Sequence, residues 1–198
     1  MSACGGKAEV AKSDTEIDHS KMDHSKMDHS QMDHSTKTSS ENAANAPYDL
    51  QFLDTMIAHH QGAVDMAEPC GARAEHAEIK TLCANIITSQ RKEIADMKAW
   101  REKWFPGAAP AINMEMAGMA DSMKGMDMKK LSASSGNDFD LEFIHQMTPH
   151  HKGAIVMADE AIRKSSRDEI KKIAKEILAA QQSEIDQMAK WQTAWSNK

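Results

Sequence analysis

The chain has 198 residues and a formal net charge of −6, with 24 Lys and Arg against 30 Asp and Glu. This charge argues against a nucleic-acid partner or an anionic membrane surface, and no apolar run reaches the roughly 18 residues of a membrane-spanning helix. The length allows one ordinary domain of about 150 residues preceded by a tail. The 16 methionines are an unusual excess for a chain of this size.

The first predicted segment is a polar repeat. Met-Asp-His-Ser occurs three times between residues 21 and 35 at a spacing of five, and Ile17-Asp18-His19-Ser20 precedes it. This period turns a helix by about 140° between successive histidines, so they share no helical face. We therefore expect residues 1–46 to form a disordered tail that collects metal ions, because imidazole and thioether recur together. A low-complexity linker is the alternative. The candidate ligands of the tail are His19, Met22, His24, Met27, His29, Met32 and His34.

The start of the tail points to the cell envelope. Ser2-Ala3-Cys4-Gly5 resembles the cleavage end of a bacterial lipoprotein signal, which makes Cys4 a candidate site for a lipid anchor. A plain cytosolic start is the alternative. Because the polar tail follows directly, it would serve as a tether from such an anchor. We expect a periplasmic or envelope location.

Residues 49–104 are repeated as residues 140–195. The two segments align without a gap at an offset of 91 and agree at 20 of 56 positions, so each copy is one supersecondary unit. In the first copy, a stripe with helical spacing runs from Phe52 to Ala67 and a second from Ile79 to Trp104. Each copy is therefore predicted to be a helical hairpin, and the two hairpins span residues 47–105 and 139–198.

The turns and helix ends have weaker signals. We expect turns at residues 73–77 and 165–167, with Asp168 as the cap of the last helix. Pro69 should end the first helix early or kink it. Two hairpins that each carry one apolar face should bury these faces against each other. This predicts an all-α four-helix bundle with pseudo-twofold symmetry over residues 47–198.

Residues 106–138 connect the two hairpins. Their Pro, Gly and Ser content predicts a crossover rather than a core element. The methionines of this segment either pack onto the bundle as a cover or form a second soft-metal patch, and a short helix would place three of them on one face. The six are Met114, Met116, Met119, Met123, Met126 and Met128.

Polar side chains interrupt the apolar stripes, and they are costly to bury unless they are paired or bind metal. In antiparallel helices joined near residue 75, residue i lies beside about 150 − i, which brings Met56 and His60 level with Glu93 and Met97. We expect such a site in each hairpin, with one histidine of each pair inward and the other at the helix boundary. A Glu–His pair that satisfies itself is the alternative. The gathered residues are Met56, His59, His60, Gln90, Glu93 and Met97, then Met147, His150, His151, Gln181, Glu184 and Met188.

Two patterns carry a family resemblance. M-x-x-H-H-x-G-A-x-x-M-A starts at Met56 and Q-x-x-E-I-x-x-M-x-x-W at Gln90, and both recur in the second copy. Over residues 48–195 the chain resembles the family called domain of unknown function 305. The resemblance implies a ferritin-like bundle in an exported protein that handles copper or silver, and it adds Met66 and Met157 to the metal-binding positions. The chain departs from the family at Pro69 and Cys70, where an uninterrupted helix is expected.

Cys70 and Cys83 are placed to face each other across the first hairpin by the same arithmetic. Their counterparts in the second copy are Ala161 and Ala174. A disulfide is one outcome in an exported protein, and two reduced core thiols are the other.

Our leading hypothesis is a copper-binding protein without catalytic activity. It would sequester or chaperone Cu(I), with Ag(I) as a second soft ion and Cu(II) at the tail, and a copper efflux or chaperone protein would be its partner. Two alternatives stay open: a ferritin-like di-metal oxidase, and an envelope stress or interaction module without metal. The oxidase needs four carboxylates and two Glu-x-x-His pairs, whereas this core offers only Glu93 and Glu184.

Overall fold

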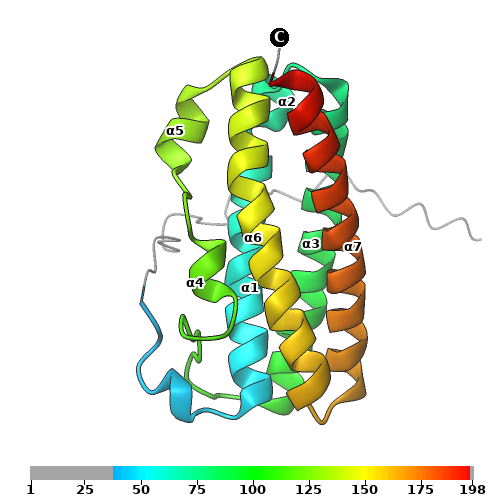
Figure 1. The fold of residues 1–198 in the computed structure, drawn as a ribbon. Helices are drawn as coiled ribbons and strands as arrows, with labels where there is room; N and C mark the ends of the chain where they lie inside the picture. The colour runs from blue at the N-terminus through cyan, green and yellow to red at the C-terminus, as the bar shows by residue number, and fades with distance from the viewer. Residues whose placement is uncertain (1–37, 197–198) are drawn as a thin grey trace, which may run out of the picture. The chain divides into compact units, whose positions relative to one another are not determined.

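The computed structural model describes residues 38–196. Its long helices are α1 (Tyr48–Ala67), α3 (Ala77–Trp104), α6 (Asn137–Lys164) and α7 (Asp168–Trp195). Figure 1 shows these four helices side by side, with α4 (Met119–Ser122) and α5 (Met128–Ala133) next to α6. No β-strand occurs within residues 38–196. The prediction of an all-α four-helix bundle is confirmed.

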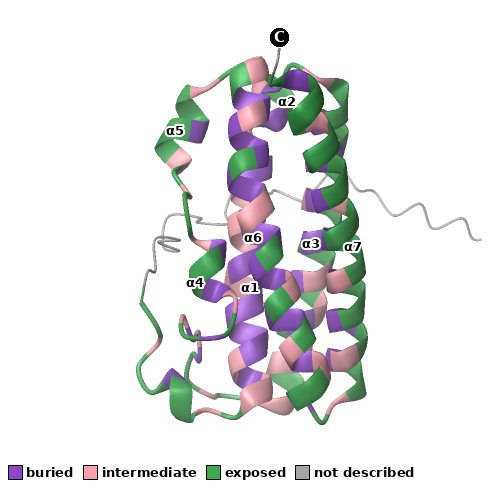
Figure 2. Cartoon of the chain, in the orientation of Figure 1, coloured by how far each residue is buried: buried purple, intermediate pink, exposed green. Residues whose placement is uncertain are grey.

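The backbones pack closely within each hairpin, α1 against α3 and α6 against α7, and the hairpins meet along α1 and α6. Figure 2 shows that each long helix turns its buried residues inward. The core divides into two clusters of buried side chains, one around Phe139 and Phe143 and one around Phe52 and Leu53. None of the described helices is long and apolar enough to cross a membrane.

The folded region begins earlier than we expected. Residues 1–37, which include Cys4 and all the predicted tail ligands, lie outside the described residues. Residues 38–46 pack on the crossover: the N–H of Ser40 donates to the carbonyl oxygen of Ile112 at 2.7 Å, and the N–H of Met114 donates to Oγ of Ser39 at 2.9 Å. A short 3₁₀ helix, η4 (Ala43–Asn45), follows and buries Ala43. The boundary predicted at residue 46 therefore places these residues wrongly in the tail.

The turns fall where the sequence indicates, with two local differences. The helix is interrupted around Pro69, as expected: α1 ends at Ala67, and Pro69 precedes the one-turn α2 (Cys70–Arg73). In the second copy α6 runs on without a break, although Pro149 lies inside it. The residue at the N-cap of α7 is Arg167, so Asp168 is the first helical residue and not the cap.

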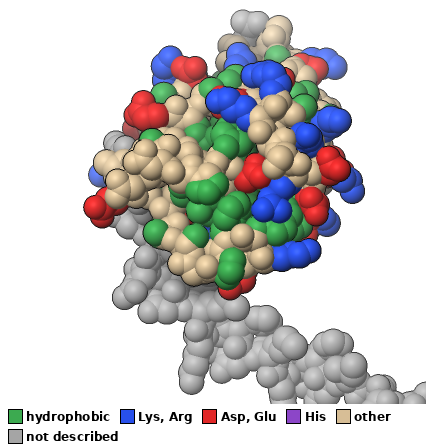
Figure 3. Space-filling model, turned by 90° about the horizontal axis from the view of Figure 1, so that it is seen from below, with side chains coloured by type: hydrophobic (Ala, Val, Ile, Leu, Met, Phe, Trp, Pro, Cys, Tyr) green, Lys and Arg blue, Asp and Glu red, His purple; other side chains and the backbone are tan. Residues whose placement is uncertain are grey.

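Equivalent contacts close the two ends of the bundle. At one end the buried carboxylate of Asp140 accepts from Nδ1 of His76 at 2.7 Å, and the His76 ring stacks on Trp195 with centroids 3.8 Å apart. At the other end Arg167 lies 3.3 Å from Asp49 and over the ring of Trp104. Each partner sits 91 residues from its equivalent. Figure 3 shows hydrophobic side chains gathered at the second end among charged ones.

The crossover is fixed along α1 and α6. Asp54 on α1 accepts from the N–H of Ala111 at 2.9 Å and pairs with Arg101 on α3 at 2.7 Å. Further along, α4 lies so close to α6 that a Cβ on Gly153 would overlap Oγ of Ser122 and the carbonyl oxygen of Gly118. The absence of a side chain at Gly153 therefore allows the crossover to approach α6 closely.

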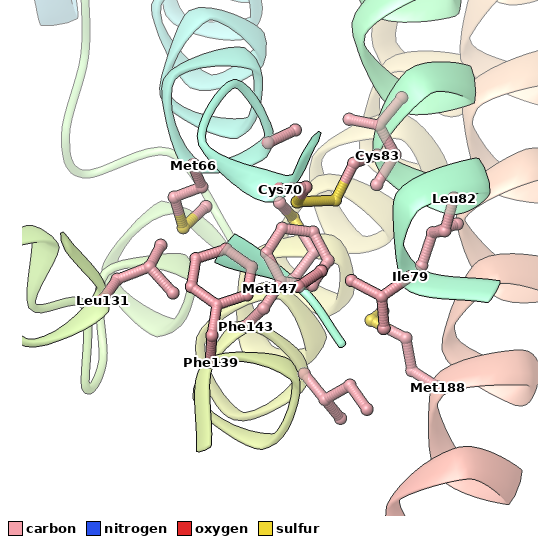
Figure 4. Packing of buried hydrophobic residues seen from close by; sticks show 14 of the residues in the cluster. Met66, Cys70, Ile79, Leu82, Cys83, Leu131, Phe139, Phe143, Met147 and Met188 are labelled. Carbon is pink, nitrogen blue, oxygen red and sulfur yellow. A yellow bond between two sulfur atoms is a disulfide. The ribbon is translucent and has the colours of Figure 1, made fainter. Parts of the chain in front are cut away.

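Figure 4 shows the core cluster around the disulfide. Cys70 and Cys83 are joined, with Cα atoms 6.3 Å apart, and they belong to the same buried cluster as Met66 and Phe143. It closes a loop with a sequence separation of 13 that contains α2 and the turn. The disulfide outcome of the two that the sequence allowed is the one observed.

Replacing Cys70 and Cys83 together with Ala should lower the free energy of unfolding by about 2–3 kcal/mol, because a loop of this size loses its cross-link in the unfolded chain. Urea unfolding with and without reductant measures the effect. Reductant should lower the stability of the wild type to about that of the variant and leave the variant unchanged. A wild type insensitive to reductant would contradict this assignment.

Gly153→Ala should destabilise the bundle by about 1–3 kcal/mol, because the new methyl group overlaps backbone and side-chain atoms of α4. The equivalent Gly62→Ala is the matched control: its Cβ meets only Nε2 of His150, at an ordinary 3.5 Å. That change should be neutral or stabilising, since Ala is favoured over Gly in helices by about 1 kcal/mol. Urea unfolding of both variants compares them, and equal effects would show that α4 does not dock as described.

Candidate metal centre

Four imidazoles meet in the middle of the bundle. His59 and His60 come from α1 and His150 and His151 from α6, and none is more than 2% exposed. All four are therefore interior. The expectation that one histidine of each pair lies at the helix boundary is wrong, because α1 and α6 face each other and each helix also faces its hairpin partner.

The second histidine of each pair bonds a glutamate within its own hairpin. Nε2 of His60 lies 2.6 Å from Oε2 of Glu93 on α3, and Nε2 of His151 lies 2.6 Å from Oε2 of Glu184 on α7. These contacts match the predicted register of both hairpins. An ionised carboxylate only accepts, so Nε2 carries the proton in each pair. Such a carboxylate orients an imidazole for metal binding through the other ring nitrogen.

The first histidines face each other across the two hairpins. The rings of His59 and His150 have centroids 3.7 Å apart. Nε2 of His59 lies 3.2 Å from the carbonyl oxygen of His150 and 3.1 Å from Oγ of Ser122. Because the carbonyl only accepts and the Ser122 hydroxyl donates to Gly118, the Nε2–H of His59 donates to both. Sequence reasoning missed Ser122, since its only signal is its position between Met119 and Met123.

Nδ1 of all four histidines is buried and has no hydrogen-bond partner. In His59, His60 and His151 the proton on Nε2 leaves Nδ1 with a free lone pair. A buried polar atom without a partner is costly, and an imidazole lone pair is a good ligand for copper and for other transition metals. Oε1 of Gln90 and Oε1 of Gln181 are also buried without partners.

Thioethers supply the second kind of donor. The side chains of Met56, Met97, Met147 and Met188 are fully buried. Met56 and Met97 share one cluster and Met147 and Met188 the other, as the register predicts. The two methionines that the family resemblance added each pack with the other copy of the repeat. Met66 lies in the cluster of Met147, and Met157 lies in the cluster of Met56. Pattern matching grouped each with its own hairpin.

The crossover methionines cover the α1–α6 side. Met116 and Met119 are buried in the cluster of Met56, and Met114 and Met123 pack partly against it. Met126 and Met128 pack partly against the other cluster. These contacts match the cover that was one of the two expectations for the segment. Ser122 also brings α4 into contact with the histidines.

Within residues 38–196, no three His, Cys, Asp or Glu side chains are arranged to hold one metal ion. Each of the two Glu–His pairs uses its carboxylate in a hydrogen bond. A site in this core would therefore have to combine imidazole nitrogen with methionine sulfur. This donor set favours soft ions such as Cu(I) and Ag(I) over oxygen-preferring ions.

Burial lowers the pKa of His59 and of His150 well below the usual 6.5, and the neighbouring imidazoles lower both further. These two rings are therefore neutral at neutral pH. The neutral imidazole is the form that binds metal, so neither ring has to lose a proton before an ion binds.

The fold and core define a class: a four-helix bundle of two repeated hairpins with imidazole and thioether donors inside. The model of the domain of unknown function 305 (DUF305) matches residues 3–101 and 49–192, and the chain belongs to this family. Among curated proteins, none matches it.

Solved structures give close matches. CopM in its Ag-bound form is 39% identical, over 74% of this chain and 96% of CopM, with a TM-score of 0.64. CopM has also been solved in Cu(I)-bound and Cu(II)-bound forms. A Streptomyces coelicolor member of the family, inferred to be secreted, is 28% identical over 75% of this chain and 92% of its own, with a TM-score of 0.67.

The metal-free bundle should lose stability as the pH falls below 6.5. Above that value the two histidines are neutral in both states; below it the unfolded chain binds protons that the folded chain, with its lowered pKa values, does not. Each histidine should cost up to about 1.4 kcal/mol per pH unit. Urea unfolding at pH 7.5, 6.5 and 5.5 measures the slope. His59→Gln with His150→Gln should flatten it, and an unchanged slope in that variant would refute the assignment.

Proposed function

We propose that this protein binds Cu(I) and Ag(I) through imidazole and thioether groups in the bundle core and so keeps these ions sequestered. The observation that carries the proposal is that Nδ1 of all four core histidines is buried without a hydrogen-bond partner. Fully buried methionines pack in the same core. The relationship to CopM, a protein that has been solved with silver and with copper bound, supports the choice of ions.

The protein acts without catalysis in this proposal. A di-metal oxidase would need carboxylates that bridge two ions. Glu93 and Glu184 are the acids bonded to the core histidines, whereas the buried Asp54 and Asp140 hold Arg101 and His76 near the helix ends. This distribution favours holding an ion over activating one.

The remaining parts of the proposal concern the surroundings of the bundle. The His/Met repeat would capture Cu(I) and Cu(II) and raise their local concentration near the core, and the crossover methionines would extend the soft-donor surface. An envelope location, with or without a lipid at Cys4, agrees with a relative inferred to be secreted and with a disulfide between Cys70 and Cys83. A copper efflux or chaperone protein would receive the ion.

Met56→Leu with Met147→Leu tests the core site. Leu nearly conserves volume and should cost less than about 1.5 kcal/mol per site, so the variant should stay a helical bundle. It removes one soft donor from each copy. A ligand at one hundred times its Kd stabilises a fold by about 2.7 kcal/mol, so Cu(I) should raise the melting temperature of the wild type by several degrees.

The double variant should lose most of that copper-induced rise, as measured by circular dichroism under anaerobic conditions. Leu53→Met is a control that adds a thioether elsewhere in the same cluster and should leave the rise intact. If the double variant keeps the full shift, these methionines only fill space and the proposed site is wrong.

A further inference from the structure

The two long sides of the bundle core differ in what covers them. On the α1–α6 side the crossover lies over the histidines, with Ser122 bonded to His59 and α4 pressed onto Gly153. On the opposite side α3 and α7 approach each other less closely than α1 and α6 do. Figure 1 shows α3 and α7 side by side, with α4 and α5 on the other side of α6.

Two grooves lie along the α3–α7 seam, with volumes of about 380 and 370 Å³. They are equivalent, since Glu93, Asp96 and Trp100 in the first correspond to Glu184, Gln187 and Trp191 in the second at the repeat offset of 91. The first groove is lined mainly by Glu93, Asp96, Trp100, Glu169, Lys172 and Glu176. The second is lined mainly by Glu78, Thr81, Asn85, Glu184, Gln187 and Trp191.

The lining of each groove includes the glutamate that bonds a core histidine. The side chains of Glu93 and Glu184 are 19% and 15% exposed, whereas their partners His60 and His151 are fully buried. These carboxylates are therefore in contact with both the solvent of the groove and the buried imidazole. An ion that approaches from the groove meets a carboxylate before it meets nitrogen or sulfur.

We propose that the two α3–α7 grooves are the entry routes by which monovalent soft cations reach the core, and that Glu93 and Glu184 are the residues that receive them. The inference rests on the proposed function and names how its site is filled. An incoming ion exchanges a water ligand for a carboxylate oxygen and then exchanges that oxygen for core imidazole and thioether. No electron is transferred, and the imidazole keeps its Nε2 proton.

The wall charges offer a test that leaves the ligands untouched. Asn85 and Glu176 occupy equivalent positions in the two grooves. Asn85→Lys with Glu176→Lys adds three positive charges there. The matched control, Ala120→Lys with Asp121→Lys, adds the same three charges on exposed positions of α4, over the opposite side. The control also tests entry beneath the crossover.

Silver nitrate in chloride-free buffer is the probe, mixed in a stopped-flow instrument with the full chain. All four tryptophans lie between residues 100 and 195, and Trp100 and Trp191 line the grooves, so their fluorescence reports on the bundle. Equilibrium titration of the same variants gives the amount of silver bound.

The groove variant should take up silver about three- to tenfold more slowly at low ionic strength, because like charge lowers the local concentration of the ion. High concentrations of sodium nitrate should shrink the difference. The amount bound at equilibrium should match the wild type, and the α4 control should keep the wild-type rate.

Equal rates in all three proteins, or slowing in the α4 control alone, would overturn the entry route while leaving core binding in place. A wild type that binds no silver in its bundle, seen as no fluorescence change and no thermal shift, would instead remove the proposed function and the route with it. The two failures are therefore distinguishable.

Discussion

Burying four imidazoles inside one bundle is the constraint on which the rest of this structure depends. Two of the rings face each other at 3.7 Å, a distance at which two charged rings would repel strongly. The other two each require an acceptor for Nε2, and only a glutamate on the facing helix supplies it. The hairpin register, the polar break in each apolar stripe and the serine that the crossover places against His59 all follow from this need.

Some of this could be read from the sequence. The ungapped repeat at an offset of 91 predicts two hairpins. The antiparallel register of the helices in the first hairpin then places His60 opposite Glu93 and Cys70 opposite Cys83. These are contacts within one supersecondary unit, where the chain itself sets the distance. The bundle architecture followed because each hairpin has one apolar face to bury.

Contacts between the hairpins could not be read in the same way. Nothing in the spacing of residues says that His59 meets His150, or that Met66 packs with the methionines of the other copy, because these depend on how two units dock. The boundary at residue 46 failed for a related reason. A short polar segment is held to the crossover by hydrogen bonds, in which the Ser39 hydroxyl accepts from the N–H of Met114 and the N–H of Ser40 donates to Ile112, and a hydrophobic pattern does not predict such contacts. The N-cap at Arg167 instead of Asp168 is a local ambiguity of one residue.

The crossover has a consequence for how the two halves behave. A single stretch of chain that passes over a twofold axis cannot obey the symmetry of that axis, so it must treat the two sides unequally. Here it bonds His59 through Ser122 and presses on Gly153, while His150 and Gly62 receive no equivalent contact from it. Under the proposed function, the two copies of the motif would therefore bind ions with two different affinities, and the protein would fill stepwise over a wider range of ion concentration than a symmetric pair of sites.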